Sequence, residues 1–388
     1  MDASTARWLV SPEAADALAR AAAEADPDSL AAATRMRASL PPERAAAVLD
    51  QIALRRRARR KFADAADGFF WTALGLEQAS RPAVSARRAA RFAALGAEAG
   101  VDLGCGCGAD AVALSRAGLR VTGVELDEVT AILAAANVAA DDGSRVLTGD
   151  ATELAPGLLG ESVAVFCDPG RRSASGRSWR LADLSPSWEF VAGLLDGRRA
   201  ACVKLGPGFP AALIPDTCEA EWISDAGDVV EAGLWAGPGV VPGRRRAVVG
   251  EHELVAEGRV DAPAVSAPKE FVYEPDGAVG ASGLIPKLAW VLGAARLQEG
   301  VAYLTSDAFV RTPFATAFRV VEALPYSEKA LRGWVRERRI GVLEIKKRGI
   351  EVDPASLRRK LRPSGPGKAT LILTPTASGA LALVVERV

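Results

Sequence analysis

Histidine is almost missing from this chain of 388 residues, because His252 is the only one. The five cysteines are odd in number and lie in apolar, strand-like surroundings, which indicates reduced, buried thiols and not a disulfide framework. Cys105 and Cys107 form a C-x-C pair, but a structural zinc site takes four ligands and no second cysteine pair exists. We therefore expect no metal centre.

Long apolar runs and net charge are also missing. No window approaches the roughly 18 uncharged apolar residues of a membrane span. The opening MDASTARWLVSPEAADALAR carries acids and an arginine where a signal peptide needs a cationic start and an apolar core. Lys plus Arg equals Asp plus Glu at 48 each, so attraction to an anionic partner must come from local patches. We expect a cytoplasmic protein with no membrane partner.

The sequence pattern divides the chain into four parts. Residues 1–90 are alanine-rich with charges at helical spacing, which predicts a helical region. Residues 91–250 alternate short valine-rich runs with helical segments, as is typical of a parallel α/β sheet. The neighbouring runs VVEAGLWAG and RRRAVVG predict a closing antiparallel hairpin. Residues 251–317 are expected to form a connecting segment, and residues 318–388 a compact α+β module.

The stretch VDLGCGCGADAVAL joins an apolar run to an expected helix and has three alternating glycines. Gly104, Gly106 and Gly108 make G-x-G-x-G, one residue tighter than the dinucleotide fingerprint. Glycine lets the backbone approach a ligand and adopt positive φ, and the next helix presents free N–H groups. Asp102 ends the preceding strand. The stretch predicts a nucleotide cradle, with a simple strand-to-helix turn as the alternative.

Two further acids follow the next expected strands. Glu125 in VTGVELD lies about twenty residues on, where a carboxylate can hydrogen-bond two ribose hydroxyls. Asp150 in VLTGDATEL can accept a hydrogen from an exocyclic amine such as adenine N6. Together they indicate an adenosine ligand across the carboxyl ends of the strands. The glycine spacing and Asp150 argue against the competing nicotinamide dinucleotide.

These motifs together resemble the class I S-adenosylmethionine-dependent methyltransferases over about residues 91–250. VDLGCGCG looks like the first motif of that family, GVELD like the acidic end of its second strand, and GDA like its adenine-contacting turn. The resemblance implies an α/β, Rossmann-like core of seven strands with S-adenosyl-L-methionine as cofactor. It assigns four residues to the methionine end of the cofactor, Asp102, Gly104, Gly106 and Gly108. It assigns Glu125 to the ribose and Asp150 to the adenine.

The chemistry motif is expected in VAVFCDPGRRSASGRSWR, the fourth strand and its loop. Methyltransferases of amino groups have Asp or Asn, Pro, Pro and an aromatic here. The carboxylate and the next backbone carbonyl accept hydrogens from the target amine, and the aromatic stacks on the base. This chain keeps Asp168 and Pro169, which we expect to be catalytic. Lys204, at the end of the fifth strand, either contacts substrate phosphate or simply ends the strand.

The loop behind Pro169 departs from the family pattern. Arg171 and Arg172 stand there, and guanidinium groups match phosphate oxygens, with an ordinary salt-bridged loop as the alternative. No aromatic occupies the expected place, so stacking on the substrate would fall to Trp179, or to Phe70 and Trp71 of the helical region.

The D-P-x-R-R variant, with EQASRPAVSARRAARF upstream and LEIKKRGIEVDPASLRRKL downstream, resembles bacterial methyltransferases with a C-terminal THUMP-like domain. That group is distantly similar to RNA methyltransferases of the trimethylguanosine synthase type. THUMP domains bind RNA, so the resemblance implies methylation of an exocyclic base amine in rRNA or tRNA. Residues 319–368 hold 14 Lys or Arg against 6 Asp or Glu. The implied RNA platform comprises Lys329, Arg336, Arg338, Arg339, Lys346, Lys347, Arg348, Arg358, Arg359 and Lys360.

A second basic cluster lies in the helical region and precedes three aromatics that look exposed. It is either a nucleic-acid surface or a solvated helix face beside packed aromatics. Two other functions stay open, methylation of a small-molecule or protein amine and RNA binding without catalysis on a retained cofactor fold. The cluster and its aromatics are Arg55, Arg56, Arg57, Arg59, Arg60, Lys61, Phe69, Phe70 and Trp71.

Overall fold

Two compact units make up the chain, Met1–Glu219 with Gly233–Pro242, and Ala220–Ala232 with Gly243–Val388. The computed structural model describes residues 1–139, 143–160, 162–171 and 181–388. In these ranges no helix is both long enough and apolar enough to cross a membrane.

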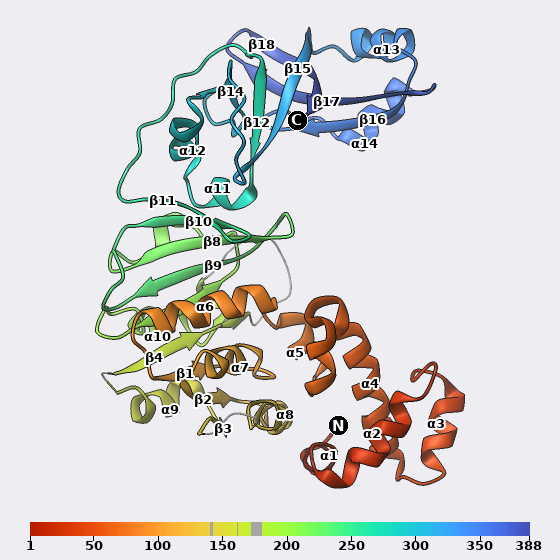
Figure 1. The fold of residues 1–388 in the computed structure, drawn as a ribbon, viewed down its shortest axis with the longest axis vertical. Coiled ribbons are helices and arrows are strands. Elements are labelled where there is room, and N and C mark those ends of the chain that lie inside the picture. The colour runs from red at the N-terminus through yellow and green to blue at the C-terminus, as the bar shows by residue number, and fades with distance from the viewer. Residues whose placement is uncertain (140–142, 161, 172–180) are drawn as a thin grey trace. The chain divides into compact units, whose positions relative to one another are not determined.

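The first unit opens with helices, as the alanine-rich sequence predicts (Figure 1). The longest, α4, starts at a proline in its first turn and ends in three cations, which suit the negative end of the helix dipole. Its buried face packs with the other helices around a small core that includes Leu133 of helix α8 (Glu128–Val138). The helices are α1 (Ala3–Leu9), α2 (Ala15–Ala22), α3 (Leu30–Arg37), α4 (Pro42–Phe62), α5 (Ala73–Gln78) and α6 (Pro82–Ala94).

A nine-stranded sheet follows, in the order β11-β10-β8-β9-β7-β4-β1-β2-β3. The four strands β4, β1, β2 and β3 are parallel, and β7 joins β4 in the same sense. The Rossmann-like fold class is therefore confirmed, with two strands more than the seven expected. The strands are β1 (Ala99–Leu103), β2 (Arg120–Glu125), β3 (Arg145–Thr148), β4 (Val163–Cys167), β7 (Ala201–Leu205), β8 (Glu219–Asp225), β9 (Asp228–Ala236), β10 (Arg245–Val249) and β11 (His252–Ala256).

The prediction of a hairpin formed by VVEAGLWAG and RRRAVVG is wrong. These runs are β9 and β10, and β8 lies between them. The tight turn lies upstream, where Ala226 and Gly227 both adopt positive φ, 52° and 86°, and join β8 to β9. Strand β10 instead pairs parallel to β8 and antiparallel to β11.

Helices of the first unit flank this sheet and connect its parallel strands (Figure 1). Helix α7 packs on β1 and β2, and α8 packs on β2 and β3. A two-stranded ribbon pairs Gly170 with Ser185 directly after β4. The connecting elements are α7 (Ala109–Arg116), α8 (Glu128–Val138), α9 (Ala151–Leu158), β5 (Gly170–Arg171), β6 (Leu184–Ser185) and α10 (Trp188–Gly193).

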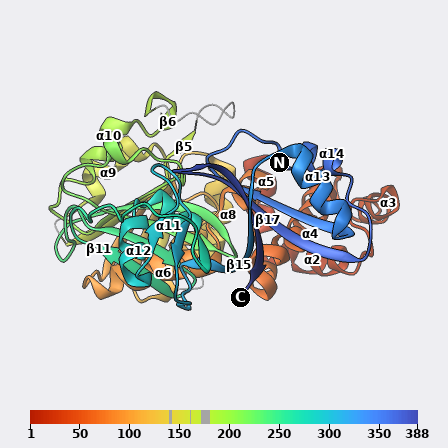
Figure 2. The ribbon, with the colours of Figure 1, turned by 90° about the horizontal axis from the view of Figure 1, so that it is seen from above.

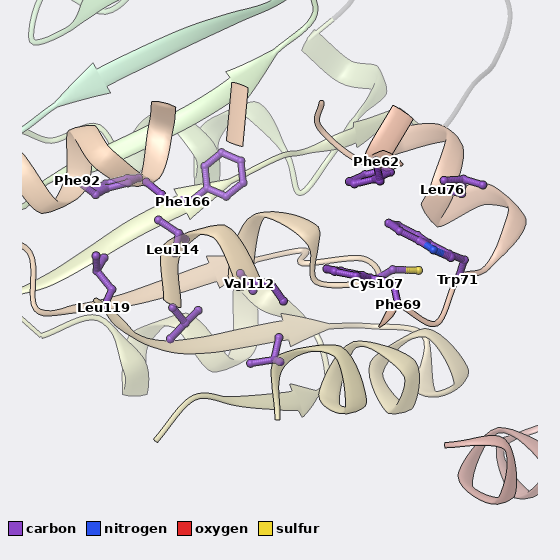
Figure 3. Packing of buried hydrophobic residues seen from close by; sticks show 14 of the residues in the cluster. Phe62, Phe69, Trp71, Leu76, Phe92, Cys107, Val112, Leu114, Leu119 and Phe166 are labelled. Carbon is purple, nitrogen blue, oxygen red and sulfur yellow. The ribbon is translucent and has the colours of Figure 1, made fainter. Parts of the chain in front are cut away.

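The aromatics after α4 are buried, so the expectation that they are exposed is wrong for two of the three. Phe69 and Trp71 are 7% and 1% exposed, and Phe70 is half-buried. The Trp71 ring stacks on Phe69 at 5.0 Å and meets Phe62 at 4.8 Å between centroids (Figure 3). Aromatic area of this size stabilises best when it is removed from water. The segment is a packed aromatic cluster, in which Phe69 and Trp71 expose no ring face on which a base could stack.

One polar side chain links this aromatic cluster to the glycine loop that contains Cys107. Asn137 of α8, 7% exposed, donates to the carbonyls of Phe70 and Cys107, both at 2.8 Å. Its amide oxygen accepts from the Phe70 N–H at 2.7 Å. Three backbone groups that face the interior are thereby satisfied by a single residue.

The second unit holds a seven-stranded sheet in the order β13-β14-β12-β15-β18-β17-β16. Strands of the expected connecting segment, β12 to β14, join the same sheet as those of the C-terminal module, because β12 pairs antiparallel with β15. Its elements are β12 (Phe271–Pro275), α11 (Gly277–Ala281), α12 (Ile285–Leu292), β13 (Ala295–Arg296), β14 (Leu304–Ser306), β15 (Ala315–Pro325), α13 (Glu328–Glu337), β16 (Ile340–Lys347), α14 (Pro354–Leu361), β17 (Gly367–Thr376) and β18 (Gly379–Arg387).

Replacing Asn137 with alanine should lower the free energy of unfolding by about 2 to 4 kcal/mol, because buried backbone groups lose their partners. Denaturant unfolding followed by tryptophan fluorescence measures the change. The exposed Arg57→Ala on α4 is the control and should stay within about 0.5 kcal/mol of the wild type. Equal stability of the two variants would contradict the bridging role of Asn137.

Candidate cofactor and active site

The glycine loop between β1 and α7 has the backbone that its sequence predicts. Gly104, Gly106 and Gly108 adopt φ of 83°, 54° and 81°, a region that other residues enter only with strain. Gly108 begins α7, and a β-carbon there would press within 3.2 Å of Val138. Around Gly106 the space is open. The loop thus needs its glycines for conformation, and at Gly108 also for packing.

The two cysteines of the loop are packing residues. A β-carbon on Gly123 would lie 2.9 Å from the Cys105 sulfur, and one on Gly75 would collide with the Cys107 sulfur. Each thiol therefore fills a space that a glycine leaves. Burial raises the pKa of both thiols, so they stay protonated. All five cysteines are free and buried, as expected.

Asp102, at the end of β1, is the most unusual charged group of the first unit. It is 1% exposed, and neither carboxylate oxygen has a hydrogen-bond partner within the described residues. Burial raises its pKa well above the ordinary value, and the nearby carboxylates of Asp110 and Asp168 raise it further. A cation placed against these oxygens would reverse the effect.

A pocket at the carboxyl ends of β1 and β4 brings the candidate residues together. Strand order reverses there, since the chain goes from β1 outward to β3 and returns through β4 on the other side. Ligands of open α/β sheets bind at such a switch point. The lining residues are Gly75, Gln78, Ala79, Asp102, Gly104, Cys105, Gly106, Cys107, Ala109, Asp110, Phe166 and Asp168.

Glu125 lies beside this pocket, at the end of β2. One carboxylate oxygen accepts from the Gly106 N–H at 2.9 Å, and the other from the Asp127 N–H at 3.0 Å. Gly104 and Cys105 both donate to the Val124 carbonyl next to it. The acid therefore holds the glycine loop, and each oxygen keeps a lone pair for a ligand.

Asp150 follows β3 and caps helix α9. Its Oδ1 accepts from the Thr152 N–H at 2.7 Å and from the Thr152 hydroxyl at 2.6 Å. These hydrogen bonds lower its pKa. The capping role explains an acid at this position by itself, and Oδ2 accepts no hydrogen bond within the described ranges.

Asp168 and Pro169 follow β4 directly. The Lys204 ammonium, at the end of β7, donates to Asp168 Oδ2 at 2.5 Å. A β-carbon on Gly104 would lie 3.8 Å from the Asp168 carbonyl oxygen, so the two loops are in close approach. Pro169 is buried. Lys204 thus has a carboxylate partner in the site, which the sequence alone did not indicate.

Several expected substrate residues lie outside what the structure describes. Arg172 and Trp179 fall between residues 171 and 181, and of Arg171 only the backbone is described. Trp71 is buried and cannot stack on a substrate, and the Arg55 guanidinium lies over the half-buried Phe70 ring at 4.9 Å.

The basic cluster of α4 is largely engaged within the protein. Arg55 donates to the Phe69 carbonyl, and Arg56 donates to carbonyls at the end of α2. Arg59 pairs with Asp67, and Lys61 donates to the Ala79 carbonyl. These contacts favour the structural interpretation of the cluster over a nucleic-acid surface.

Sequence reasoning missed the partner of Asp110. The Arg88 guanidinium of α6 forms a buried ion pair with this carboxylate and lies over the Phe166 ring at 4.3 Å. An acid in the first turn of α7 was visible in the sequence, but nothing local distinguishes Arg88 from Arg87 beside it. Gln78 of α5 also lines the pocket.

The parallel sheet, the glycine loop and the acids around it define the class, an S-adenosylmethionine-dependent methyltransferase. Two curated proteins of Mycobacterium tuberculosis, strains CDC 1551 and H37Rv, are each 31% identical over 360 residues, which cover 89% of this chain and 97% of the relative. Both are called uncharacterized S-adenosylmethionine-dependent methyltransferases. The chain belongs to this methyltransferase family, and S-adenosyl-L-methionine is its cofactor.

Other comparisons agree with the architecture. A crystal structure of a candidate methyltransferase from Porphyromonas gingivalis W83 has the same fold, with a TM-score of 0.77 over 96% of this chain and 98% of that chain, at 24% identity. The family described as THUMP domain-like matches residues 315–387, and a domain of unknown function, DUF8688, matches residues 2–58. The C-terminal domain is therefore THUMP-like.

The raised pKa of Asp102 predicts how Asp102→Asn changes stability with pH. Below about pH 4 the carboxyl is protonated in the folded and the unfolded chain, so the two proteins should not differ in this respect. As pH rises, the unfolded chain ionises while the folded one keeps its proton. The wild type should therefore lose stability relative to the variant by up to about 1.4 kcal/mol per pH unit until the folded pKa is reached.

Denaturant unfolding of both proteins from pH 4 to pH 8 measures this difference. Asp150→Asn is a control of opposite sign, because hydrogen bonds lower the pKa of Asp150 and its ionised form favours folding. A pH-independent difference between Asp102→Asn and the wild type would show that the buried carboxyl is not protonated in the folded chain.

Proposed function

We propose that this enzyme methylates an exocyclic amine of an RNA base, in rRNA or tRNA. One observation carries the proposal: Asp168, which precedes Pro169 and is suited to orient an amine, lines the same pocket as Asp102 and the glycine loop. An amine held at Asp168 would face a methyl group held over the loop. The THUMP-like match supports RNA as the substrate class.

The residues present fit the cofactor. Asp102 offers two buried oxygens without partners, and we assign them to the cationic amino group of the methionine end. Gly104, Gly106 and Gly108 give the backbone room and N–H groups beside it. We assign the ribose hydroxyls to the remaining lone pairs of Glu125, and the adenine amine to Oδ2 of Asp150.

Asp168 acts by positioning. S-adenosyl-L-methionine supplies an electrophilic methyl group on a sulfonium. The Asp168 carboxylate and the Pro169 backbone carbonyl would accept the two hydrogens of the target amine. They would thereby aim the nitrogen lone pair at the methyl carbon. Methyl transfer would exchange the carbon–sulfur bond for a nitrogen–carbon bond, the nitrogen would release one proton to solvent, and S-adenosylhomocysteine would be the co-product.

Lys204 changes role under this proposal. Its ammonium occupies Oδ2 of Asp168, and Oδ1 accepts no hydrogen bond within the described residues. We therefore assign Lys204 to fixing the carboxylate so that Oδ1 faces the amine, in place of a phosphate contact. Phosphate contacts stay assigned to Arg171 and Arg172, and base stacking to Trp179.

Asp102→Asn should weaken S-adenosyl-L-methionine binding by about 10- to 100-fold, because a charge-assisted hydrogen bond is lost. Isothermal titration calorimetry measures the affinity. Binding to the wild type should also weaken as pH falls, since the raised pKa of Asp102 makes protonation compete with the cation. Asp67→Asn, an exposed acid paired with Arg59, should bind normally. Unchanged affinity in Asp102→Asn would remove the assignment of Asp102.

Asp168→Ala should lower methyl transfer by at least about 100-fold while leaving cofactor affinity unchanged, because only orientation of the amine is lost. Mass spectrometry of nucleosides from rRNA and tRNA should show one methylated base missing in cells without the gene. Wild-type protein should restore it, and Asp168→Ala should not. If no methylated nucleoside changes, the amine of a small molecule or protein becomes the better substrate.

A further inference from the structure

A broad groove runs between two helices of the THUMP-like domain. Helices α13 and α14 contact each other and lie side by side in both views (Figure 1, Figure 2). The groove has a volume of about 1110 Å³. It is lined by Glu328, Lys329, Arg332, Gly333, Arg336, Ser356, Arg359, Lys360, Leu361 and Arg362.

The groove is strongly cationic. Six of its lining residues are Lys or Arg, all exposed, against the single acid Glu328. Glu328 pairs with Lys360 at 2.9 Å. Within the described ranges the other five cations, Lys329, Arg332, Arg336, Arg359 and Arg362, have no ion pair and no side-chain hydrogen bond. Such a charge concentration is stable only in solvent or against an anion.

Helix periodicity places these charges on one face. Residues 329, 332 and 336 of α13 follow the spacing of i, i+3 and i+7, so their side chains project to the same side. Leu331 and Val335 are fully buried on the opposite side, which anchors the helix to the sheet. The cationic face is therefore held rigidly and its charges cannot turn inward.

Three other cations of the expected RNA platform already have partners within the protein. Arg338 lies 3.5 Å from Glu322, and Lys346 pairs with Glu274 at 2.8 Å. Arg358 donates to the Leu343 carbonyl at 2.7 Å. Four of the ten platform residues line the groove, Lys329, Arg336, Arg359 and Lys360. Arg332 and Arg362 also line it, although they were not expected in the platform.

We propose that the α13–α14 groove binds the phosphate backbone of double-stranded RNA without reading its sequence. Recognition of single-stranded RNA relies on aromatic side chains that stack on bases, and the lining residues include no aromatic. Duplex RNA is recognised by its shape and phosphates instead. This inference rests on the proposed RNA substrate and specifies its form, a base in or beside a helical segment.

Salt dependence of RNA binding tests the groove in the full-length protein. Fluorescence anisotropy would compare two RNA duplexes of about 16 base pairs and unrelated sequence with a single-stranded oligouridine of equal length. The wild type should bind both duplexes equally and more tightly than the single strand. The triple variant Arg332→Gln, Arg336→Gln, Arg359→Gln should bind duplex on the order of 100-fold more weakly at low salt, with a salt slope smaller by about 2 to 3.

A matched control removes the same charge elsewhere in the domain. Arg319→Gln, Lys368→Gln, Arg387→Gln changes three exposed cations that lie outside both the groove lining and the expected platform, and Arg319 is paired with Glu386. It should keep the wild-type affinity within about threefold. Thermal unfolding of both triple variants checks that the domain stays folded.

Several results would overturn the groove proposal. The proposal fails if the control variant loses as much duplex affinity as the groove variant, or if the groove variant loses none. It also fails if the wild type binds the single strand more tightly than the duplex. Displacement of the duplex by polyglutamate at comparable concentration would indicate an acidic protein partner instead. The methylation proposal fails separately. If the groove variant loses duplex binding but no methylated nucleoside depends on the gene, the groove stands and RNA methylation does not.

Discussion

The electrostatics of the pocket depend on one buried carboxylate. Asp102, Asp110 and Asp168 lie close enough for their charges to interact, and each of the last two has a cation of its own, Arg88 and Lys204. Asp102 has none within the described residues. Burial therefore keeps the Asp102 carboxyl protonated until a cation lies against it, so its ionisation is coupled to the binding of a cationic group.

A loop built of glycines keeps its shape only if its surroundings fix it. Here the surroundings are glycines facing cysteines, Gly123 against Cys105 and Gly75 against Cys107, together with Asn137 holding the Cys107 carbonyl. Gly75 belongs to α5, so the N-terminal helical region forms one wall of the pocket. Preorganisation of this kind comes from packed elements, which hold a site more tightly than loops do. The helical region is thus part of the structural unit that holds this pocket.

The sequence was sufficient to predict those parts of the site in which a residue's position along a strand determines its position in the sheet. Parallel strands put their carboxyl ends at one edge, so Asp102 and Asp168 could be brought together from the ends of their valine-rich runs. Pairings across elements were not predictable in this way. Lys204 is 36 residues from Asp168, and Arg88 is 22 from Asp110. The β8–β9 turn was missed because the apolar runs near it fit more than one strand pairing.

Counts of basic residues predicted two nucleic-acid surfaces, and contacts distinguish between them. Arginines of α4 lie against free carbonyls, as where Arg56 reaches Ala22 and Ala25 at 3.1 and 2.9 Å. A helix C-terminus presents unpaired carbonyls with partial negative charge, so it competes with phosphate for nearby cations. The cations of α13, Lys329, Arg332 and Arg336, have neither an ion pair nor a side-chain hydrogen bond within the described residues. In a chain whose charges cancel overall, such cations are the ones that remain available to an anionic polymer.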